Sequence, residues 1–271
     1  MKDAIKISGL KKSYGSNMVL RGLDFQIKQG EIFALLGVNG AGKTTTLEAI
    51  EGLRKYDEGT IVVNGKTGIQ LQSSSLPAHI KPMEAIKLFA KWNHTNIDTA
   101  MLKALGIKEI KQSQYLQLST GQKRRLHLAL ALISNPDVIF LDEPTAGLDV
   151  EGRLSLHEQI RKLKSQGKTI VLASHDMAEV ESLCDRIAIL NRGKIIFCGT
   201  PSELTEKLGR KYFIHLKTQK GEETYETDTI EGTLISLLEE CKQKNIQILD
   251  IKVDRGTLEQ HFIEMARRGS E

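Results

Sequence analysis

Residues 31 to 53 place a glycine-rich loop between an apolar run and an amphipathic run. Glu31-Ile-Phe-Ala-Leu-Leu is typical of a strand that is buried on both faces of a sheet. Leu47, Ile50 and Leu53 recur at helical spacing. A buried strand that runs through such a loop into a helix predicts an α/β fold, with the loop at the carboxyl end of the strand.

The loop, Gly37-Val-Asn-Gly-Ala-Gly-Lys-Thr, fits the pattern G-x-x-x-x-G-K-[ST] in full. Glycines let backbone N–H groups converge on a phosphate, and the helix that follows presents its positive end to the same anion. Lys43 adds a charge near the β- and γ-phosphates, and the Thr44 hydroxyl is a ligand for Mg²⁺. The residues predicted to bind nucleotide here are Gly37, Asn39, Gly40, Ala41, Gly42, Lys43, Thr44 and Thr45.

A second apolar run ends in two carboxylates. Val138-Ile-Phe-Leu is followed directly by Asp142 and Glu143. A carboxylate in this place can hold the magnesium shell opposite Thr44, and the next one can polarise a water for attack on the γ-phosphate. We therefore predict Asp142 as a metal ligand and Glu143 as a catalytic base.

The remaining chain alternates predicted strands and helices around one helical insertion. The insertion covers about residues 76–134, and strands are expected near 138–141, 169–173 and 186–190. After about Gly209 a strand at 212–217, a helix at 231–242, a strand at 246–253 and a helix at 257–267 predict a small α/β appendix. We predict domains at 1–209 and 210–271.

Leu118-Ser-Thr-Gly-Gln precedes a helix rich in leucine and alanine, and it resembles the signature of ABC ATPases, most often written L-S-G-G-Q. Ser119 can cap that helix, and the helix N-terminus can cradle a phosphate. With the phosphate loop and the acidic pair in the expected order, the chain is identified as a member of the ABC ATPases over about residues 3–205. The signature residues implied to bind nucleotide are Ser119, Gly121 and Gln122.

The resemblance implies roles for four further positions. Tyr14 corresponds to the aromatic that stacks on adenine, and Asp149 belongs to the D-loop Ala146-Gly-Leu-Asp. Gln72 matches the Q-loop glutamine, which touches Mg²⁺ and the water and relays motion to the membrane partner; Gln70 offers an alternative register. His175 matches the switch histidine at the γ-phosphate. The implied catalytic set is Glu143, His175, Lys43 and Gln72, and the implied metal set is Thr44, Gln72 and Asp142.

Two departures from the family pattern affect local geometry. Thr120 replaces the usual first signature glycine, and a position that needed positive φ would strain a threonine. We still expect function to survive. The segment from Asn64 to Gln72 is also shorter than usual, which leaves room for the loss of a strand or a turn before the Q-loop.

The resemblance implies a phosphate-loop (RecA-like) α/β core, an antiparallel β subdomain and a helical signature subdomain. It also implies an ATPase that uses ATP and Mg²⁺, pairs head to tail with a second ATPase subunit, expected to be a second copy, and drives a separate permease. Pro201-Ser-Glu-Leu and the segment 257–264 resemble the ATPases of ABC-2-type exporters. The alternatives are an importer ATPase or a soluble ABC protein that acts on ribosomes or DNA.

Composition agrees with a globular protein made and kept in the cytoplasm, and the resemblance implies a place on the cytoplasmic face of the membrane through the permease. No apolar run approaches the roughly 20 residues of a spanning helix. The net charge of +4 is too small to predict nucleic-acid binding, and no nucleic-acid partner is expected. The three cysteines match no zinc or redox spacing, so we expect reduced thiols; the regulatory or dimer-contact role of residues 210–271 stays open.

Overall fold

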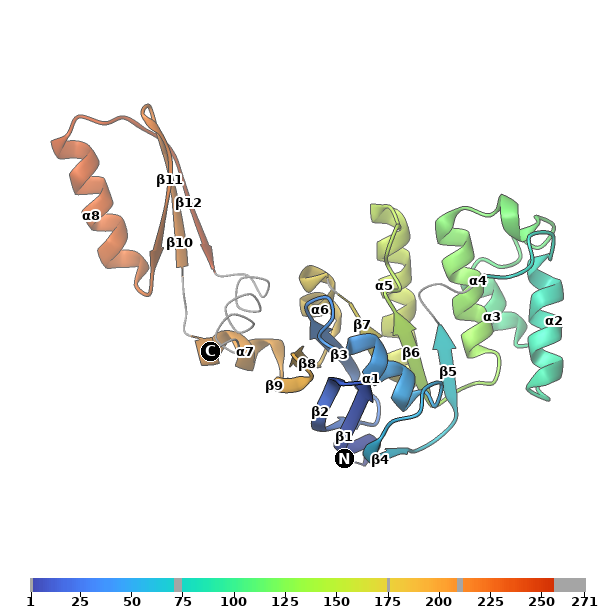
Figure 1. The fold of residues 1–271 in the computed structure, drawn as a ribbon. Coiled ribbons are helices and arrows are strands. Elements are labelled where there is room, and N and C mark those ends of the chain that lie inside the picture. Colours follow the sequence, from blue (N-terminus) through green and yellow to red (C-terminus); the bar gives the residue numbers. More distant parts are fainter. Residues whose placement is uncertain (1, 71–74, 175, 209–211, 256–271) are drawn as a thin grey trace. The chain divides into compact units, whose positions relative to one another are not determined.

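The computed structural model describes residues 2–70, 75–174, 176–208 and 212–255 (Figure 1). The contacts within the chain divide it into two compact units, Met1–Cys198 and Gly199–Glu271. Helix α7 (Pro201–Leu208) therefore falls in the second unit, whereas the predicted boundary lies after it. The two units are described separately below.

A six-stranded sheet forms the centre of the first unit, in the order β5-β6-β7-β3-β8-β9. Its strands are β3 (Ile32–Gly37), β5 (Thr67–Gln70), β6 (Val138–Asp142), β7 (Thr169–Ala173), β8 (Arg186–Asn191) and β9 (Lys194–Gly199). Five of these strands run parallel to their neighbours in the sheet: β5, β6, β7, β3 and β8. β9 follows β8 through the two-residue turn at Arg192 and Gly193, a connection that joins antiparallel strands.

The sequence of β3 explains its place between β7 and β8. All six of its residues are buried, because helices and the second sheet cover both faces of a parallel sheet. The predicted strands at 31–36, 138–141, 169–173 and 186–190 are confirmed as β3, β6, β7 and β8.

A three-stranded antiparallel sheet, in the order β2-β1-β4, packs on this core. Its strands are β1 (Asp3–Tyr14), β2 (Asn17–Lys28) and β4 (Glu58–Val63). The apolar residues that alternate along β1 and β2 join the main hydrophobic cluster, and Phe25 stacks on Phe33 of β3 with ring centroids 5.8 Å apart. The antiparallel β subdomain predicted from the resemblance is thus present.

The short link before the Q-loop does not remove a strand. β5 forms directly after a turn at Gly65, where φ is +113°, and the Asp137 side chain accepts a hydrogen bond from Lys66 N at 2.9 Å. A Cβ on Gly68 would lie 2.2 Å from the carbonyl oxygen of Ala131. Only glycine therefore lets the helix that contains Ala131 approach this edge strand so closely.

The helical insertion consists of three α-helices, which Figure 1 shows grouped beside β5. They are α2 (Pro82–Trp92), α3 (Thr99–Ala104) and α4 (Thr120–Leu132). Each begins at a favourable cap: Pro82 occupies the first turn of α2, Asp98 accepts from the N–H groups of α3, and Ser119 caps α4. All three lie within the helical insertion predicted at about residues 76–134.

Helices flank the central sheet at the points where its strands end. These are α1 (Lys43–Ile50), α5 (Val150–Ser165) and α6 (Met177–Leu183). Among the described residues no helix is both long and apolar enough to cross a membrane.

The second unit contains α7 and a three-stranded antiparallel sheet with one helix. The strands follow the order β11-β10-β12 and are β10 (Tyr212–Thr218), β11 (Gly221–Thr227) and β12 (Ile248–Arg255), with α8 at Ile230–Gln243. Ile214 and Leu216 of β10 are buried, as are Leu237 and Cys241 of α8. β11 was not predicted, and the predicted helix at 257–267 lies outside the described residues.

Candidate functional site

Three functional segments leave the same edge of the central sheet. β6, β7 and β3 are parallel neighbours, and their registers align Asp142 with Ala173 and Leu35 with Ala173. The phosphate loop after β3, the acidic pair at the end of β6 and the segment after β7 therefore begin side by side. A crevice at the carboxyl ends of parallel strands is where α/β proteins bind their ligands.

The phosphate loop has the backbone geometry that an anion cradle needs. Gly40 and Gly42 adopt φ values of +79° and +108°, and a Cβ on Gly42 would lie 2.8 Å from Cδ2 of Leu20. Gly37 is confined as well, because its Cβ would lie 2.6 Å from the carbonyl oxygen of Leu190. Glycine is therefore required for conformation at Gly42 and for space at Gly37.

Lys43 lies inside this loop. Its Nζ donates hydrogen bonds to the carbonyl oxygens of Gly37 and Val38, at 2.5 and 3.3 Å. Burial lowers the pKa of Lys43, while the negative charges of Glu143 and Asp142 oppose that shift. The predicted loop residues form one segment, in which Asn39, Gly40 and Thr44 are exposed, Lys43 and Thr45 half-buried and Ala41 buried.

The acidic pair closes the site opposite Lys43. Burial raises the pKa of Asp142, and the nearby Glu143 and Glu48 charges raise it further, against the opposing effects of Arg124 and Lys43. Glu143 adopts φ = +46°, a left-handed conformation that is uncommon for residues other than glycine. Its backbone N–H donates to the carbonyl of Ala173 at 2.9 Å, so the end of β6 is tied to the end of β7.

Two further acids at this site were missed from the sequence. Burial raises the pKa of Glu51 to about 7, and the charges of Asp142 and Glu48 add to the shift. Thr44, Glu48 and Glu51 stand at positions i, i+4 and i+7, which share one face of a helix. That spacing could have revealed them. The Thr44 hydroxyl and the Asp142 carboxylate are hard oxygen donors of the kind that Mg²⁺ prefers, so these two residues fit the expected ion.

The signature residues begin α4. Gln122 N donates to Ser119 Oγ at 3.3 Å, and Ser119 N donates to Gln122 Oε1 at 2.9 Å, which is a capping box. Thr120 is the first helical residue and is absent from the described non-glycine residues with positive φ. The condition for strain at Thr120 is therefore not met: this position has helical backbone, which threonine adopts freely.

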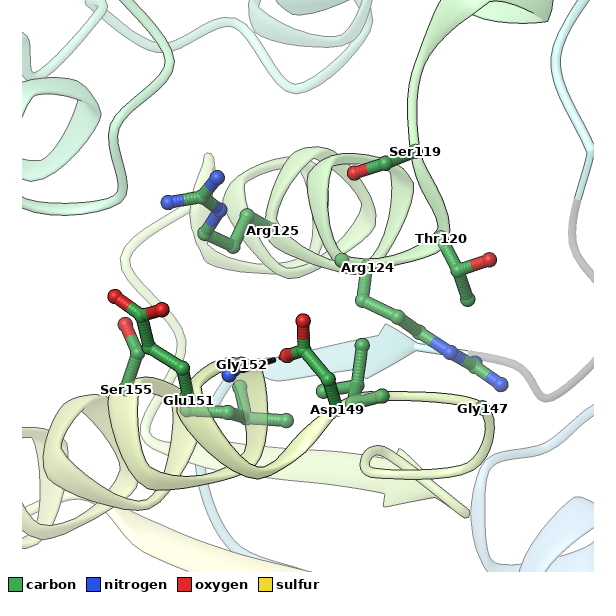
Figure 2. A pocket seen from close by; sticks show the side chains of 12 residues that line it. Ser119, Thr120, Arg124, Arg125, Gly147, Asp149, Glu151, Gly152 and Ser155 are labelled. Atoms are coloured by element: carbon green, nitrogen blue, oxygen red, sulfur yellow. Dashed lines mark hydrogen bonds between the residues drawn. The ribbon is translucent and has the colours of Figure 1, made fainter.

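The D-loop lies against the signature in the same chain (Figure 2). Asp149 caps α5, because its Oδ1 accepts a hydrogen bond from Gly152 N at 2.8 Å. Gly147 adopts φ = +75°, and a Cβ there would touch Cγ2 of Thr120 at 3.4 Å. A cleft of about 460 Å³ separates the two segments, and its lining residues all fall within 119–125 and 147–156.

That cleft contains no residue of the chain's own phosphate loop. Arg124 and Arg125 line it beside Gly121, and Figure 2 shows the Arg124 side chain between the signature helix and the D-loop. Arg124 also influences the pKa of Asp142. Neither arginine was singled out from the sequence, although both directly follow the signature.

Tyr14 ends β1 with 42% of its surface exposed. Lys12 Nζ and the guanidinium carbon of Arg54 each lie 5.5 Å from its ring centroid. An exposed aromatic face is the feature that adenine stacking needs. The role of Tyr14 stays a prediction.

Gln72 and His175, the two remaining predicted site residues, lie outside the described residues. Gln70, the alternative to Gln72, ends β5 and is only 2% exposed. Among the described residues neither polar atom of its side chain has a hydrogen-bond partner. The choice between Gln70 and Gln72 stays open.

Comparison with known proteins assigns the family. The ABC transporter family profile matches residues 20–146. An uncharacterized ABC transporter ATP-binding protein of Methanocaldococcus jannaschii is 35% identical, over 97% of this chain and 100% of its own length. The linearmycin resistance ATP-binding protein LnrL of Bacillus subtilis is 30% identical, over 97% of this chain and 98% of its own length. The Nod factor export ATP-binding protein I of Burkholderia orbicola is 37% identical, over 74% and 72%.

Solved structures agree. The ATP-binding subunit of an ABC transporter superposes with a TM-score of 0.69 at 26% identity, covering 76% of this chain and 93% of that one. The ADP conformation of another ATP-binding cassette has the same fold, with a TM-score of 0.67 at 21% identity and coverages of 75% and 93%. The chain therefore belongs to the ATP-binding subunits of ABC transporters, a family that hydrolyses ATP to drive transport.

Proposed function

We propose that this ATPase drives export through a separate membrane permease, by pairing head to tail with a second copy of itself when ATP binds. The observation that carries the proposal is the separation of the two half-sites. The phosphate loop and acidic pair lie at one edge of the sheet, while the signature cleft holds residues from 119–125 and 147–156 only. A second copy supplies the missing half to each.

Export is supported by the names of two relatives. One exports Nod factors, and the other confers linearmycin resistance. The second of these matches nearly the whole chain, including the C-terminal unit. An exporter ATPase of this kind would bind its permease at the cytoplasmic face of the membrane, and would have no contact with the transported molecule.

In the proposed paired state, Ser119 and Gly121 of one copy face the γ-phosphate held by Lys43 of the other. The helix N-terminus and the Ser119 hydroxyl suit an anion. Thr44 and Asp142, with Gln72, would hold Mg²⁺, which would neutralise charge on the β- and γ-phosphates. The carboxylates of Glu48 and Glu51 add to the negative field at that position.

Hydrolysis then follows from the residues around Lys43. The Glu143 carboxylate accepts a proton from the attacking water, whose oxygen forms the new bond to the γ-phosphorus. The bond from that phosphorus to the β-γ bridging oxygen breaks, and ADP and inorganic phosphate leave. Lys43 and His175 stabilise the charge on the transferring group. Loss of the γ-phosphate removes the group that joins the two copies.

Glu143→Gln tests this scheme, because the amide keeps the side chain's shape but cannot take the proton. We expect the variant to elute as a dimer with MgATP and as a monomer without it, and to hydrolyse no ATP. Lys43→Ala, which cannot hold the phosphates, is the control and should stay monomeric in both conditions. A Glu143→Gln chain that stays monomeric and still hydrolyses ATP would contradict the proposal.

A further inference from the structure

A buried polar cluster brackets the position of the predicted switch histidine. Ser174 directly precedes residue 175 and Asp176 directly follows it. Glu179, on α6, has a side chain with no exposed surface, and its Oε2 accepts a hydrogen bond from Ser174 Oγ at 2.6 Å. Asp176 N in turn donates to the same Ser174 Oγ at 3.1 Å. The Ser174 hydroxyl thus connects the two flanks of residue 175.

His157 completes the partners of Glu179. Its Nε2 lies 3.3 Å from Glu179 Oε1, and the imidazole is 5% exposed. An ionised carboxylate only accepts hydrogen bonds, so both the imidazole N–H and the serine hydroxyl act as donors. A buried carboxylate is costly unless both its oxygens have partners. Here each oxygen has one, which fixes the carboxylate in a single orientation.

The same helix that carries His157 also holds the far side of the segment. Arg153 stands one helical turn before His157, and its NH1 donates to Asp176 Oδ2 at 2.9 Å. Asp176 Oδ1 accepts from Glu179 N, at 3.1 Å, and caps α6. α5 itself begins at its cap Asp149 in the D-loop. A rigid helix therefore runs from the D-loop to both flanks of residue 175.

We propose that Glu179, with Ser174 and His157, is a positioning cluster that sets the segment carrying His175 relative to α5 and the D-loop, and so controls the rate of hydrolysis. The proposal rests on the proposed function. None of the three side chains is expected to touch ATP. They act by holding the flanks of residue 175, where small displacements of a catalytic group have large effects on rate.

Glu179→Gln and Ser174→Ala in the full-length chain test the proposal. The readouts are kcat and KM for MgATP, equilibrium binding of a fluorescent ATP analogue, and the melting temperature. We expect kcat to fall about tenfold or more, with KM and analogue affinity within about twofold of wild type. The double variant should be no slower than Glu179→Gln alone, because the two groups act through one hydrogen bond. Glu181→Gln, an exposed carboxylate on the same helix, is the matched control.

His157 supplies the conservative comparison. His157→Gln keeps an N–H donor near the position of Nε2 and should retain most of the wild-type kcat, whereas His157→Met should lose it. If Glu179→Gln fails to fold, Ser174→Ala, which loses a single hydroxyl, carries the test. Unchanged kcat in a folded Ser174→Ala or Glu179→Gln chain overturns the proposal. So does a loss of kcat that follows the melting temperature and disappears when the assay is cooled. A wild-type chain without hydrolysis contradicts the proposed function instead.

Discussion

The backbone N–H of Glu143 donates a hydrogen bond to the carbonyl oxygen of Ala173, at 2.9 Å, across the ends of β6 and β7. This bond holds the predicted catalytic base in a left-handed conformation, with φ = +46°. The strand that ends at Asp142 is thereby joined to the strand that leads toward residue 175. Position 143 therefore needs a residue that tolerates positive φ, in addition to a side chain that can act as the base.

The first prediction concerns the left-handed backbone conformation at position 143. Glu143→Gln should leave stability nearly unchanged, whereas Glu143→Val should lower the free energy of unfolding by about 1–3 kcal/mol, because a β-branched residue is strained at positive φ. Urea denaturation of the nucleotide-free chain measures both. Glu143→Gly, which is free of that strain, should lie closer to Gln than to Val. Equal stability of the Val and Gln variants would show that the left-handed backbone is not held in solution.

The second prediction is a pH dependence at Glu51, whose pKa rises to about 7 from a usual value of 4.5. The folded state therefore binds the proton more tightly than the unfolded state. Between pH 4.5 and about pH 7 the free energy of unfolding falls as pH rises, and above about pH 7 the ionised carboxylate destabilises the fold. Glu51→Gln should stabilise the nucleotide-free chain by about 1–3 kcal/mol at pH 8 and have little effect at pH 4.5.

The measurement is urea denaturation of both chains across this pH range, with a chelator present. Glu158→Gln, which removes an exposed carboxylate on α5, is the matched control and should show no such crossover. A stabilisation by Glu51→Gln that is equal at both ends of the range would contradict the assignment. MgATP should reduce the difference in stability between Glu51→Gln and wild type at pH 8, because a bound cation favours the ionised form of the Glu51 carboxylate.

Gln70 gives the third prediction. Its side chain is buried, neither of its polar atoms has a hydrogen-bond partner within the described part of the chain, and an unsatisfied buried polar group costs about 1–3 kcal/mol. Gln70→Met removes the polar atoms with little change in volume, and should raise the melting temperature. Gln70→Ala, which leaves a cavity instead, should raise the melting temperature less than Gln70→Met does, or should lower it. Differential scanning calorimetry separates these, and a lower melting temperature for Gln70→Met would show that the amide is satisfied in solution.

Ser119 gives the fourth prediction, because its hydroxyl has two expected roles. Ser119→Ala removes the cap of α4 and should cost about 1 kcal/mol of stability. Ser119→Asp keeps a capping oxygen and should restore that stability, but it places a negative charge where the partner's γ-phosphate is expected. The Asp variant should therefore unfold like wild type and fail to form the ATP-dependent dimer. A dimer that forms normally with Ser119→Asp would argue against the phosphate role.

The central strands and most helices could be predicted because their sequences carry the information locally. β3 and β6 are continuous apolar runs, and α4 follows a capping serine. β5 could not be predicted, since Thr67-Gly-Ile-Gln has neither length nor alternation and depends on its pairing with β6, far along the chain. β11 is a polar, largely exposed segment that is a strand only because β10 pairs with it.

The candidate site shows the same division. The phosphate loop and signature residues are contiguous in sequence, and their local geometry follows from glycines and caps. The contacts of Glu179 with Ser174 and His157 join separate segments of the chain, so no local pattern displays them. The sequence left the backbone conformation of Thr120 open, and the position is unstrained because helix α4 has already begun there.

The contact between Thr120 and Gly147 has a consequence for redesign. A Cβ on Gly147 would reach the Thr120 methyl group, so the signature and the D-loop of one chain share a single packed surface. Replacing Thr120 with glycine would remove the methyl group that lies beside Gly147, and any side chain at 147 would be strained by the φ of +75°. Moving the signature or the D-loop into another ABC ATPase without the other would therefore change the surface expected to face the second copy. Positions 120 and 147 should be exchanged together.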